Sequence, residues 1–229
     1  AEGRGLFATS LLNKENPTEN VVAIGSDLHK AAPSYEAKLS AVHQQYNDLP
    51  TVGNIAKGDV SVEALLSHKP DITVLSLDHK KAAEESGLLK KMDQSGLKYV
   101  FSDFRQKPLE NTTKTISMYG QLFGKEDKAK EFNDFYDSKV KDITDRANAA
   151  KNKPKTLVWR AAGMKDCCST VKDSNLGDLV NAAGGKNMGD ELLDTESGDL
   201  TAEKILSEQP EQIIATGGSW AKDPDEPEA

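Results

Sequence analysis

The chain has 229 residues, which is enough for one large domain or two small ones. Hydrophobic residues make up 37% and charged residues 29%, a composition typical of a globular protein and not of a disordered one. The formal net charge of −8 argues against nucleic acid as a partner, because phosphate binding requires a basic surface. No apolar run is long enough to span a bilayer. The opening segment reads like the interior of a longer sequence, so we expect a mature chain whose signal peptide has been removed.

Helices and short apolar strands alternate along the first half of the chain. Each predicted strand is short and apolar, and the helix over 33–46 carries one apolar stripe. In chain order we predict helix 6–12, strand 21–25, helix 33–46, helix 61–67, strand 71–77, helix 82–91, strand 98–104 and helix 109–123.

A long helix over 126–151 follows, with apolar residues at three- and four-residue spacing and charged residues on its other faces. At 1.5 Å per residue it would span roughly 39 Å. The alternation then resumes, and residues 221–229 form an acidic, proline-containing tail that we expect to be loose. The elements predicted in this second half are strand 156–161, helix 175–183, helix 202–207 and strand 212–216.

This alternation predicts an α/β fold with parallel sheets covered by helices. We predict two Rossmann-like lobes, residues 1–124 and 153–229, joined by one long backbone helix over 125–152. The second lobe is expected to contain fewer strands than the first and to be truncated.

One phrase of the sequence occurs twice, at 61–71 and again at 201–211. Each copy has a Ser or Thr at the helix N-cap, a proline after the helix, and an apolar strand next. A separation of 140 residues is too wide for a solenoid repeat, so the repeat predicts two similar lobes.

Three motifs resemble those of the helical-backbone class of periplasmic substrate-binding proteins, which serve ABC importers for ferric siderophores, haem and cobalamin. Residues 49–54 (LPTVGN) are similar to its "LP-x-VG" turn, and 61–71 to its "S-x-E-x-LL-x-x-KPD" unit. Residues 176–187 are similar to its "LGDLI-x-x-AGG-x-N" segment. Residues 166–170 (DCCST) are similar to an iron-siderophore-like branch.

The resemblance implies a monomeric binding protein, not an enzyme, that captures a ferric chelate between its lobes and needs no cofactor of its own. It would be periplasmic, or extracellular and membrane-anchored in a Gram-positive bacterium. The resemblance also implies that Glu63 and Glu203, one in each copy of the repeat, dock into the two subunits of an ABC permease. The alternative is that each carboxylate only stabilises its helix N-terminus, by about 0.3–1 kcal/mol.

Arginines are the main candidates for ligand binding, because their planar fork suits carboxylate or catecholate oxygens. Arg105 and Arg160 lie at predicted carboxyl ends of strands, where α/β lobes bind ligands, and Arg4 precedes the first helix. Surface ion pairing, which contributes little, is the alternative, and it is the role that we expect for Arg146.

Three further residues are weaker ligand-binding candidates. They are Trp220 after the last strand, Asn54 in the first motif, and Cys168. Asn54 alternatively serves only its turn. Cys167 and Cys168 are adjacent, so a vicinal disulfide and free thiols are both possible, but neither has zinc-ligand spacing and we expect no direct metal site.

Two other functions remain open from the sequence. The same fold would serve a haem or cobalamin cargo. A thiol redox or metal-chelatase-like enzyme would use Cys167 and Cys168, and would require a thiol of low pKa.

Overall fold

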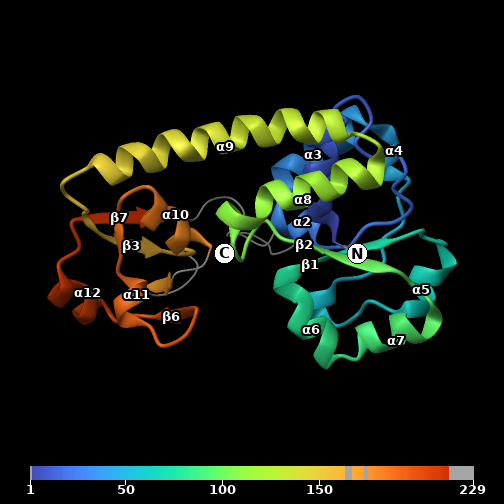
Figure 1. The fold of residues 1–229 in the computed structure, drawn as a ribbon. Coiled ribbons are helices and arrows are strands. Elements are labelled where there is room, and N and C mark those ends of the chain that lie inside the picture. The colour runs from blue at the N-terminus through green and yellow to red at the C-terminus, as the bar shows by residue number, and fades with distance from the viewer. Residues whose placement is uncertain (1, 163–166, 173–174, 217–229) are drawn as a thin grey trace. The chain divides into compact units, whose positions relative to one another are not determined.

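The computed structural model describes residues 2–162, 167–172 and 175–216. The chain divides into two compact units, Ala1–Asp103 with Thr115–Lys130 and Phe104–Lys114 with Glu131–Ala229. Both units combine helices with parallel strands, so the predicted α/β class is confirmed (Figure 1).

The first unit is built on two parallel strands, β1 (Thr73–Ser76) and β2 (Tyr99–Ser102), paired in register from Thr73↔Tyr99 to Ser76↔Ser102. A buried apolar cluster packs against them, and Leu75 and Met92 are almost fully enclosed in it. The helices of this part of the unit are η1 (Gly3–Gly5), α1 (Leu6–Leu12), α2 (Leu28–Ala31), α3 (Pro33–Val42), α4 (Gln44–Asn47), η2 (Ile55–Lys57), α5 (Val62–Ser67), η3 (Leu77–His79), α6 (Lys80–Glu85) and α7 (Leu88–Ser95).

Three predicted elements of the first unit differ from the structure. The strand over 21–25 is reduced to one parallel bridge, Ile24↔Thr51, because the other residues of the segment have no ladder partner within the described chain. The helix over 82–91 is two helices, since Gly87 at φ +73° separates α6 from α7. The helix over 33–46 is also interrupted, because His43 has a non-helical backbone.

The second unit is built on a parallel sheet of order β5-β3-β7, with β5 (Lys186–Asn187) and β7 (Gln212–Ala215) flanking the central β3 (Lys155–Trp159). A second, antiparallel pair consists of β4 (Ser169–Val171) and β6 (Ser197–Asp199). The helices are α10 (Leu176–Ala182), α11 (Gly189–Leu192) and α12 (Ala202–Glu208).

The expectation that the second half has fewer strands than the first is wrong for the described residues. β4, β5 and β6 were not predicted, because they are only two or three residues long and contain Ser, Gly, Asp, Lys and Asn. Backbone pairing in the folded chain, and not local propensity, makes these segments extended.

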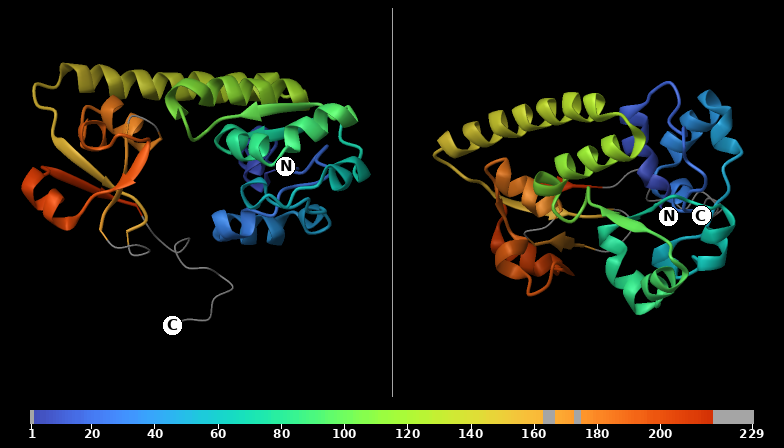
Figure 2. Two further views of the ribbon diagram at one scale, coloured as in Figure 1. Left: turned by 90° about the horizontal axis from the view of Figure 1, so that it is seen from below. Right: turned by 45° about the vertical axis from the view of Figure 1, so that its right-hand side comes forward.

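Two long helices connect β2 to β3. α8 (Pro108–Phe123) ends at Gly124, whose φ of +62° allows the chain to turn into α9 (Glu126–Ala149). α9 is an unbroken helix, as predicted for 126–151 (Figures 1 and 2). The absence of a side chain at Gly120 lets the two helices approach closely, since a Cβ there would lie 2.6 Å from that of Ala129. Tyr136 of α9 also donates a hydrogen bond to the carbonyl oxygen of Pro108, at 3.0 Å.

The 176–187 motif is explained by packing in the second unit. A Cβ on Gly177 would lie 1.9 Å from the carbonyl oxygen of Lys172, so only glycine fits there. Asn187 is fully buried, and its side-chain amide donates to the carbonyl of Val171 at 2.9 Å and to Asp190 at 2.8 Å. The motif therefore joins α10, β5 and β4.

We predict that Gly177→Ala lowers the free energy of unfolding by about 3 kcal/mol, at the upper end of the cost of overpacking, because backbone must move to admit the methyl group. Gly96→Ala is the matched control: it has φ +74° but open space around it, so it should cost only about 1 kcal/mol of backbone strain. Urea denaturation of both variants measures the difference. Equal losses would contradict the packing argument.

Candidate functional site

A polar cluster lies at the carboxyl end of β1 in the first unit. The short turn η3 follows the strand directly and places Asp78 and His79 there, and the Ser76 hydroxyl donates a hydrogen bond to Asp78. Glu2 joins them, with its Oε1 3.8 Å from Nδ1 of His79. All these side chains come from the first unit, so their arrangement is set within it.

Arg4 lies in the same cluster and is held by carboxylates. Its guanidinium pairs with Glu2, and its Nε donates to Oδ2 of Asp27 at 3.0 Å. Burial on its own lowers the pKa of Arg4, but the carboxylates of Glu2, Asp27 and Asp78 outweigh it and leave that pKa raised. A ligand carboxylate would have to compete with these internal partners for Arg4, so anion binding by Arg4 stays a prediction.

Tyr119 of α8 closes the cluster on its buried side. Its side chain is 3% exposed, and burial raises the pKa of its hydroxyl well above the ordinary value, although a hydrogen bond with Ser102 opposes this. Gly5 accommodates the ring, because a Cβ at that position would lie 2.9 Å from the tyrosine hydroxyl. Tyr119 is therefore neutral at physiological pH.

A cavity of about 460 Å³ also lies within the first unit, alongside β1. Glu2 and Tyr119 line it together with apolar side chains, among them Leu6, Ile24 and Phe123. The cavity passes between β1 and the segment around Ile24, where the predicted strand is reduced to a single bridge.

Arg160 follows the last residue of β3 in the second unit, at the carboxyl end of the central strand. Its backbone N–H donates to the carbonyl oxygen of Ser169 at 2.7 Å, in an isolated antiparallel bridge. Its side chain is half-buried and forms no ion pair with another described residue. This is the position at which parallel α/β sheets present ligand-binding groups.

Arg105 belongs to the same unit as Arg160 and lies in the turn between β2 and α8, where it is exposed. The carbonyl oxygen of its neighbour Gln106 accepts a hydrogen bond from the N–H of Asn175, at 3.0 Å, which fixes this turn against the start of α10. The structure thus gives Arg105 a defined backbone position and an exposed side chain.

Cys167 and Cys168 are joined in a disulfide, with Cys167 exposed and Cys168 only 1% exposed. Cys168 belongs to the buried cluster of the second unit, and Trp159 packs against that cluster. A thiol redox enzyme cycles between a dithiol and a disulfide, so the disulfide by itself assigns no catalytic role to the pair. Binding of ligand by Cys168 stays a prediction, since the exposed half of the pair is Cys167.

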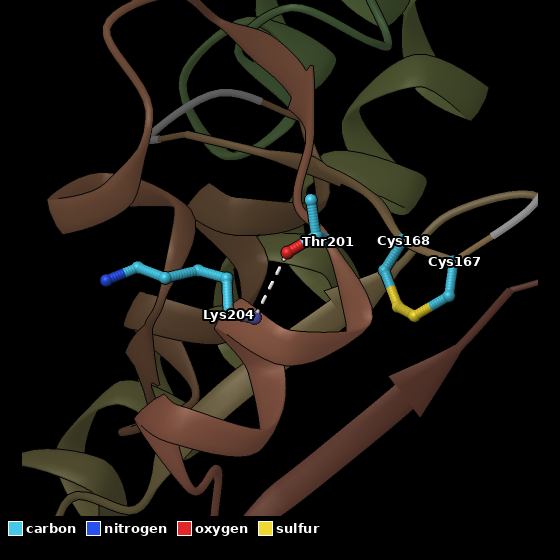
Figure 3. The surroundings of a disulfide bond; sticks show 4 residues. All are labelled: Cys167, Cys168, Thr201 and Lys204. Carbon is cyan, nitrogen blue, oxygen red and sulfur yellow. Dashed lines mark hydrogen bonds between the residues drawn. A yellow bond between two sulfur atoms is a disulfide. The ribbon is translucent and has the colours of Figure 1, made fainter.

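The disulfide lies beside the start of α12 (Figure 3). Cys168 and Leu200 exchange two backbone hydrogen bonds, of 2.7 and 2.9 Å. The next residue, Thr201, caps α12 by accepting from the N–H of Lys204 at 3.1 Å. Glu203 in the first turn of α12 is therefore placed by a short chain of contacts that begins at the disulfide.

The two copies of the repeat have the same local structure. Ser61 caps α5 by accepting from the N–H of Ala64 at 2.9 Å, as Thr201 does for α12. Lys69 and Gln209, each directly before a proline, both have left-handed backbones, with φ of +47° and +49°. Glu63 and Glu203 occupy the same place in the first helical turn, are exposed, and form no ion pair with another described residue.

The remaining predicted site residues are Asn54 and Trp220. The side-chain oxygen of Asn54 accepts from the N–H of Ala56 at 2.8 Å, so it caps η2 and serves the turn. Trp220 lies outside the described residues. Sequence reasoning did not single out Glu2 or Asp78, although the position of Asp78 directly after a predicted strand was an available signal.

The chain matches the family model described as "Periplasmic binding protein" over residues 18–226. The protein belongs to this family. That match confirms the family resemblance carried by the three sequence motifs, and it explains the pairing of two α/β units with one long helix.

Individual relatives support the assignment. The high-affinity heme uptake system protein IsdE of Staphylococcus aureus is 30% identical over 170 residues, which is 74% of this chain and 54% of the relative. The TroA-like periplasmic binding protein FepB from Veillonella parvula superimposes with a TM-score of 0.81 at 23% identity, over 94% of this chain and 62% of that one. Staphylococcus aureus IsdE, solved in complex with heme, gives a TM-score of 0.56 at 27% identity, over 76% and 63% of the two chains. The chain spans about half the length of the curated relatives it matches. Within the described residues, every helix is too short or too polar to cross a membrane.

Glu208 at the end of α12 offers a test of how that helix is anchored. Hydrogen bonds from Lys155 and Lys204 lower the pKa of Glu208 to about 2, from an ordinary value of 4.5. A carboxylate whose pKa falls on folding stabilises the folded state above its unfolded pKa, and this stabilisation is lost as the pH falls towards the folded pKa. We therefore predict that Glu208→Gln is less stable than wild type at pH 7, and that the difference shrinks between about pH 4.5 and pH 2.

Urea denaturation at pH 7 and pH 3 measures this change. Glu203→Gln on the same helix is the control, since its carboxylate has no ion-pair partner among the described residues. A difference between Glu208→Gln and wild type that stays constant with pH would contradict the ion-pair anchor.

Proposed function

We propose that this protein is the solute-binding component of an ABC importer and that its cargo is an anionic ferric chelate of the siderophore type. Family membership supports the binding role, and the relatives described above are binding proteins, not enzymes. The observation that carries the choice of cargo is Arg160, which stands at the carboxyl end of the central strand with no ion-pair partner among the described residues. An arginine fork at this position suits catecholate or carboxylate oxygens.

Arg105 supports the same cargo, because it is exposed and follows the end of β2. The protein in this role binds and releases the chelate, so its side chains hold the chelate and do not change it chemically. In this role the protein works outside the cytoplasmic membrane, in the periplasm or at the cell surface. This location agrees with the relatives that are named as periplasmic.

Glu63 and Glu203 are the proposed contacts to the permease. Equivalent positions in a structural repeat give two carboxylates with the same helix geometry, one on each unit. Exposed charges of this kind set the orientation and the rate of association more than the final affinity. A permease with two related subunits would present one basic pocket to each glutamate.

Haem is the second candidate cargo, because IsdE is a heme uptake protein and shares 30% identity with this chain. Haem also carries anionic propionates, so arginine contacts alone do not separate the two cargoes. Haem bound through an axial protein ligand to its iron would have an absorption spectrum different from that of free haem and from that of a ferric chelate.

Tryptophan-fluorescence titration with ferric siderophores, ferric citrate, haem and cobalamin tests the proposal. We predict saturable quenching by one ferric chelate, and about 10- to 100-fold weaker binding in Arg105→Ala and Arg160→Ala, since a hydrogen bond to a charged group contributes about 1.5–3 kcal/mol.

Arg146→Ala is the matched control. Arg146 is exposed on α9 and paired with Asp142 at 3.5 Å, so its loss should leave binding unchanged. Binding of haem alone, with a new absorption band, would replace the siderophore proposal by the second candidate. Equal affinities in all three arginine variants would remove the assignment of the binding residues.

Charge reversal tests docking. Glu63→Lys and Glu203→Lys should each slow association with the cognate permease, reconstituted in proteoliposomes, by on the order of tenfold, while chelate affinity stays at the wild-type value. Glu126→Lys is the control, because Glu126 is likewise exposed in the first turn of a helix but lies outside the repeat. The docking assignment fails if all three variants associate at the same rate.

A further inference from the structure

We propose that the Cys167–Cys168 disulfide is a site of thiol–disulfide exchange with a dithiol, and that its reduction loosens the first turn of α12. That turn carries Glu203, and the bond and the helix both belong to the second unit. The proposal concerns the redox state of the chain and involves no cargo. Only its consequence for permease docking rests on the proposed function, because Glu203 is one of the two proposed contacts.

The bond does not act as a staple between distant parts of the fold. Cys167 and Cys168 are neighbours in sequence, so their disulfide closes a ring that contains only these two residues. A disulfide stabilises a protein mainly by constraining the unfolded chain, and the effect grows with the length of the closed loop. The ring therefore adds little to the stability of the whole protein, and its main effect is to restrict the backbone of the two cysteines.

The two cysteines differ in their access to solvent. Cys167 is exposed, whereas Cys168 is 1% exposed and belongs to the buried cluster of the second unit. An attacking thiolate therefore reaches Cys167 and not Cys168. Exchange requires access to the sulfur that is attacked, so this exposure makes the pair reducible in the folded protein.

The exchange proceeds in two steps. A thiolate of the dithiol attacks Sγ of Cys167 and forms a mixed disulfide, while the bond to Sγ of Cys168 breaks and that sulfur leaves with the electron pair and takes up a proton. The second thiol of the donor, after losing its proton, attacks the donor sulfur of the mixed disulfide, and Cys167 leaves as a thiolate and is protonated. The donor is oxidised to a disulfide, and the cysteine pair gains two electrons and two protons.

The backbone of Cys168 connects the pair to the start of α12 (Figure 3). Its N–H donates to the carbonyl oxygen of Leu200 at 2.7 Å, and its carbonyl oxygen accepts from the N–H of Leu200 at 2.9 Å. Leu200 directly precedes Thr201, the cap of α12. Leu200 and Ile205 of that helix also pack in the same buried cluster as Cys168. The redox-active pair is therefore bonded to the residue next to the helix cap.

Reduction alters this junction through conformational entropy. Holding a residue in one backbone conformation costs entropy, and the closed ring restricts Cys168 whether or not Leu200 is paired with it. In the dithiol form the pairing has to hold this backbone by itself, so it opens more often. α12 has only seven residues, and helices of this length depend on their tertiary contacts. Its first turn should therefore loosen, whereas Lys155 holds the last turn through Glu208.

The first copy of the repeat supplies an internal control. The N–H of Leu65 donates to the carbonyl oxygen of Ser61 at 3.1 Å in α5, just as that of Ile205 donates to Thr201 at 3.1 Å in α12. The chain has only two cysteines, so α5 has no disulfide beside it. A change of redox state should therefore alter α12 and not α5.

Amide hydrogen exchange of the complete chain, with and without dithiothreitol and with no cargo present, tests the proposal. Alkylation followed by mass spectrometry confirms that both thiols are free after reduction. We expect the amides of Lys204 and Ile205 to exchange about tenfold faster in the dithiol form, because both donate to Thr201 at the loosened cap. The amides of Ala64 and Leu65 in α5 should keep their rates.

Cys167→Ser is the matched variant, because it removes the bond at the exposed residue and leaves the buried Cys168 in place. It should show the faster exchange without reductant and no response to dithiothreitol. The proposal is overturned by a bond that resists dithiothreitol in the folded protein, by equal exchange in the two forms, or by equal acceleration of α5 and α12, which would make the bond a global staple. Because neither cargo nor permease is present, each of these results leaves the proposed function intact, and failure of the chelate or docking assays leaves the exchange result intact.

Discussion

Parallel pairing of a short strand with its neighbour is the constraint on which the rest of this protein depends. In each unit a capped helix, α5 or α12, leads through a left-handed residue and a proline into a strand, β1 or β7. The backbone N–H and C=O groups of β1 then form hydrogen bonds with β2, and those of β7 with β3. Because the strands are parallel, their carboxyl ends point the same way, and the polar residues that follow them gather at one edge of each sheet.

The arginines at the two sheet edges are held differently. In the first unit the edge is acidic, and Arg4 is held by Glu2 and Asp27 instead of being offered to a ligand. In the second unit the corresponding position is Arg160, which forms no ion pair with another described residue. An arginine already held by carboxylates has little to offer an anion, whereas Arg160 can offer its guanidinium to one. The proposed chelate site follows from this contrast.

Cys168 links the buried cluster of the second unit to the helix that carries Glu203. Cys168 contributes to the buried cluster, and its backbone pairs with Leu200, one residue before the cap of α12. Lys155 and Lys204 fix the other end of the helix through Glu208. A helix held at both ends presents its exposed carboxylate in a defined orientation, which is what docking by charge requires.

The sequence by itself determined the family, the α/β class, α1, α9 and the repeated helix–strand unit. All of these depend on local signals: hydrophobic period, Ser or Thr caps, and proline and glycine positions. The same signals gave the alternative that Asn54 only serves its turn, and the capping bond to Ala56 agrees with it.

Only the tertiary structure decided the short strands and the polar clusters. β4 and β6 are extended because they pair with each other, and Gly177 is required because a carbonyl oxygen from an earlier residue lies against it. Glu2 is 76 residues from Asp78 in sequence, so no local pattern could bring them together. Folding of the chain around β1 places them side by side, because contacts between distant residues are set by packing and not by propensity.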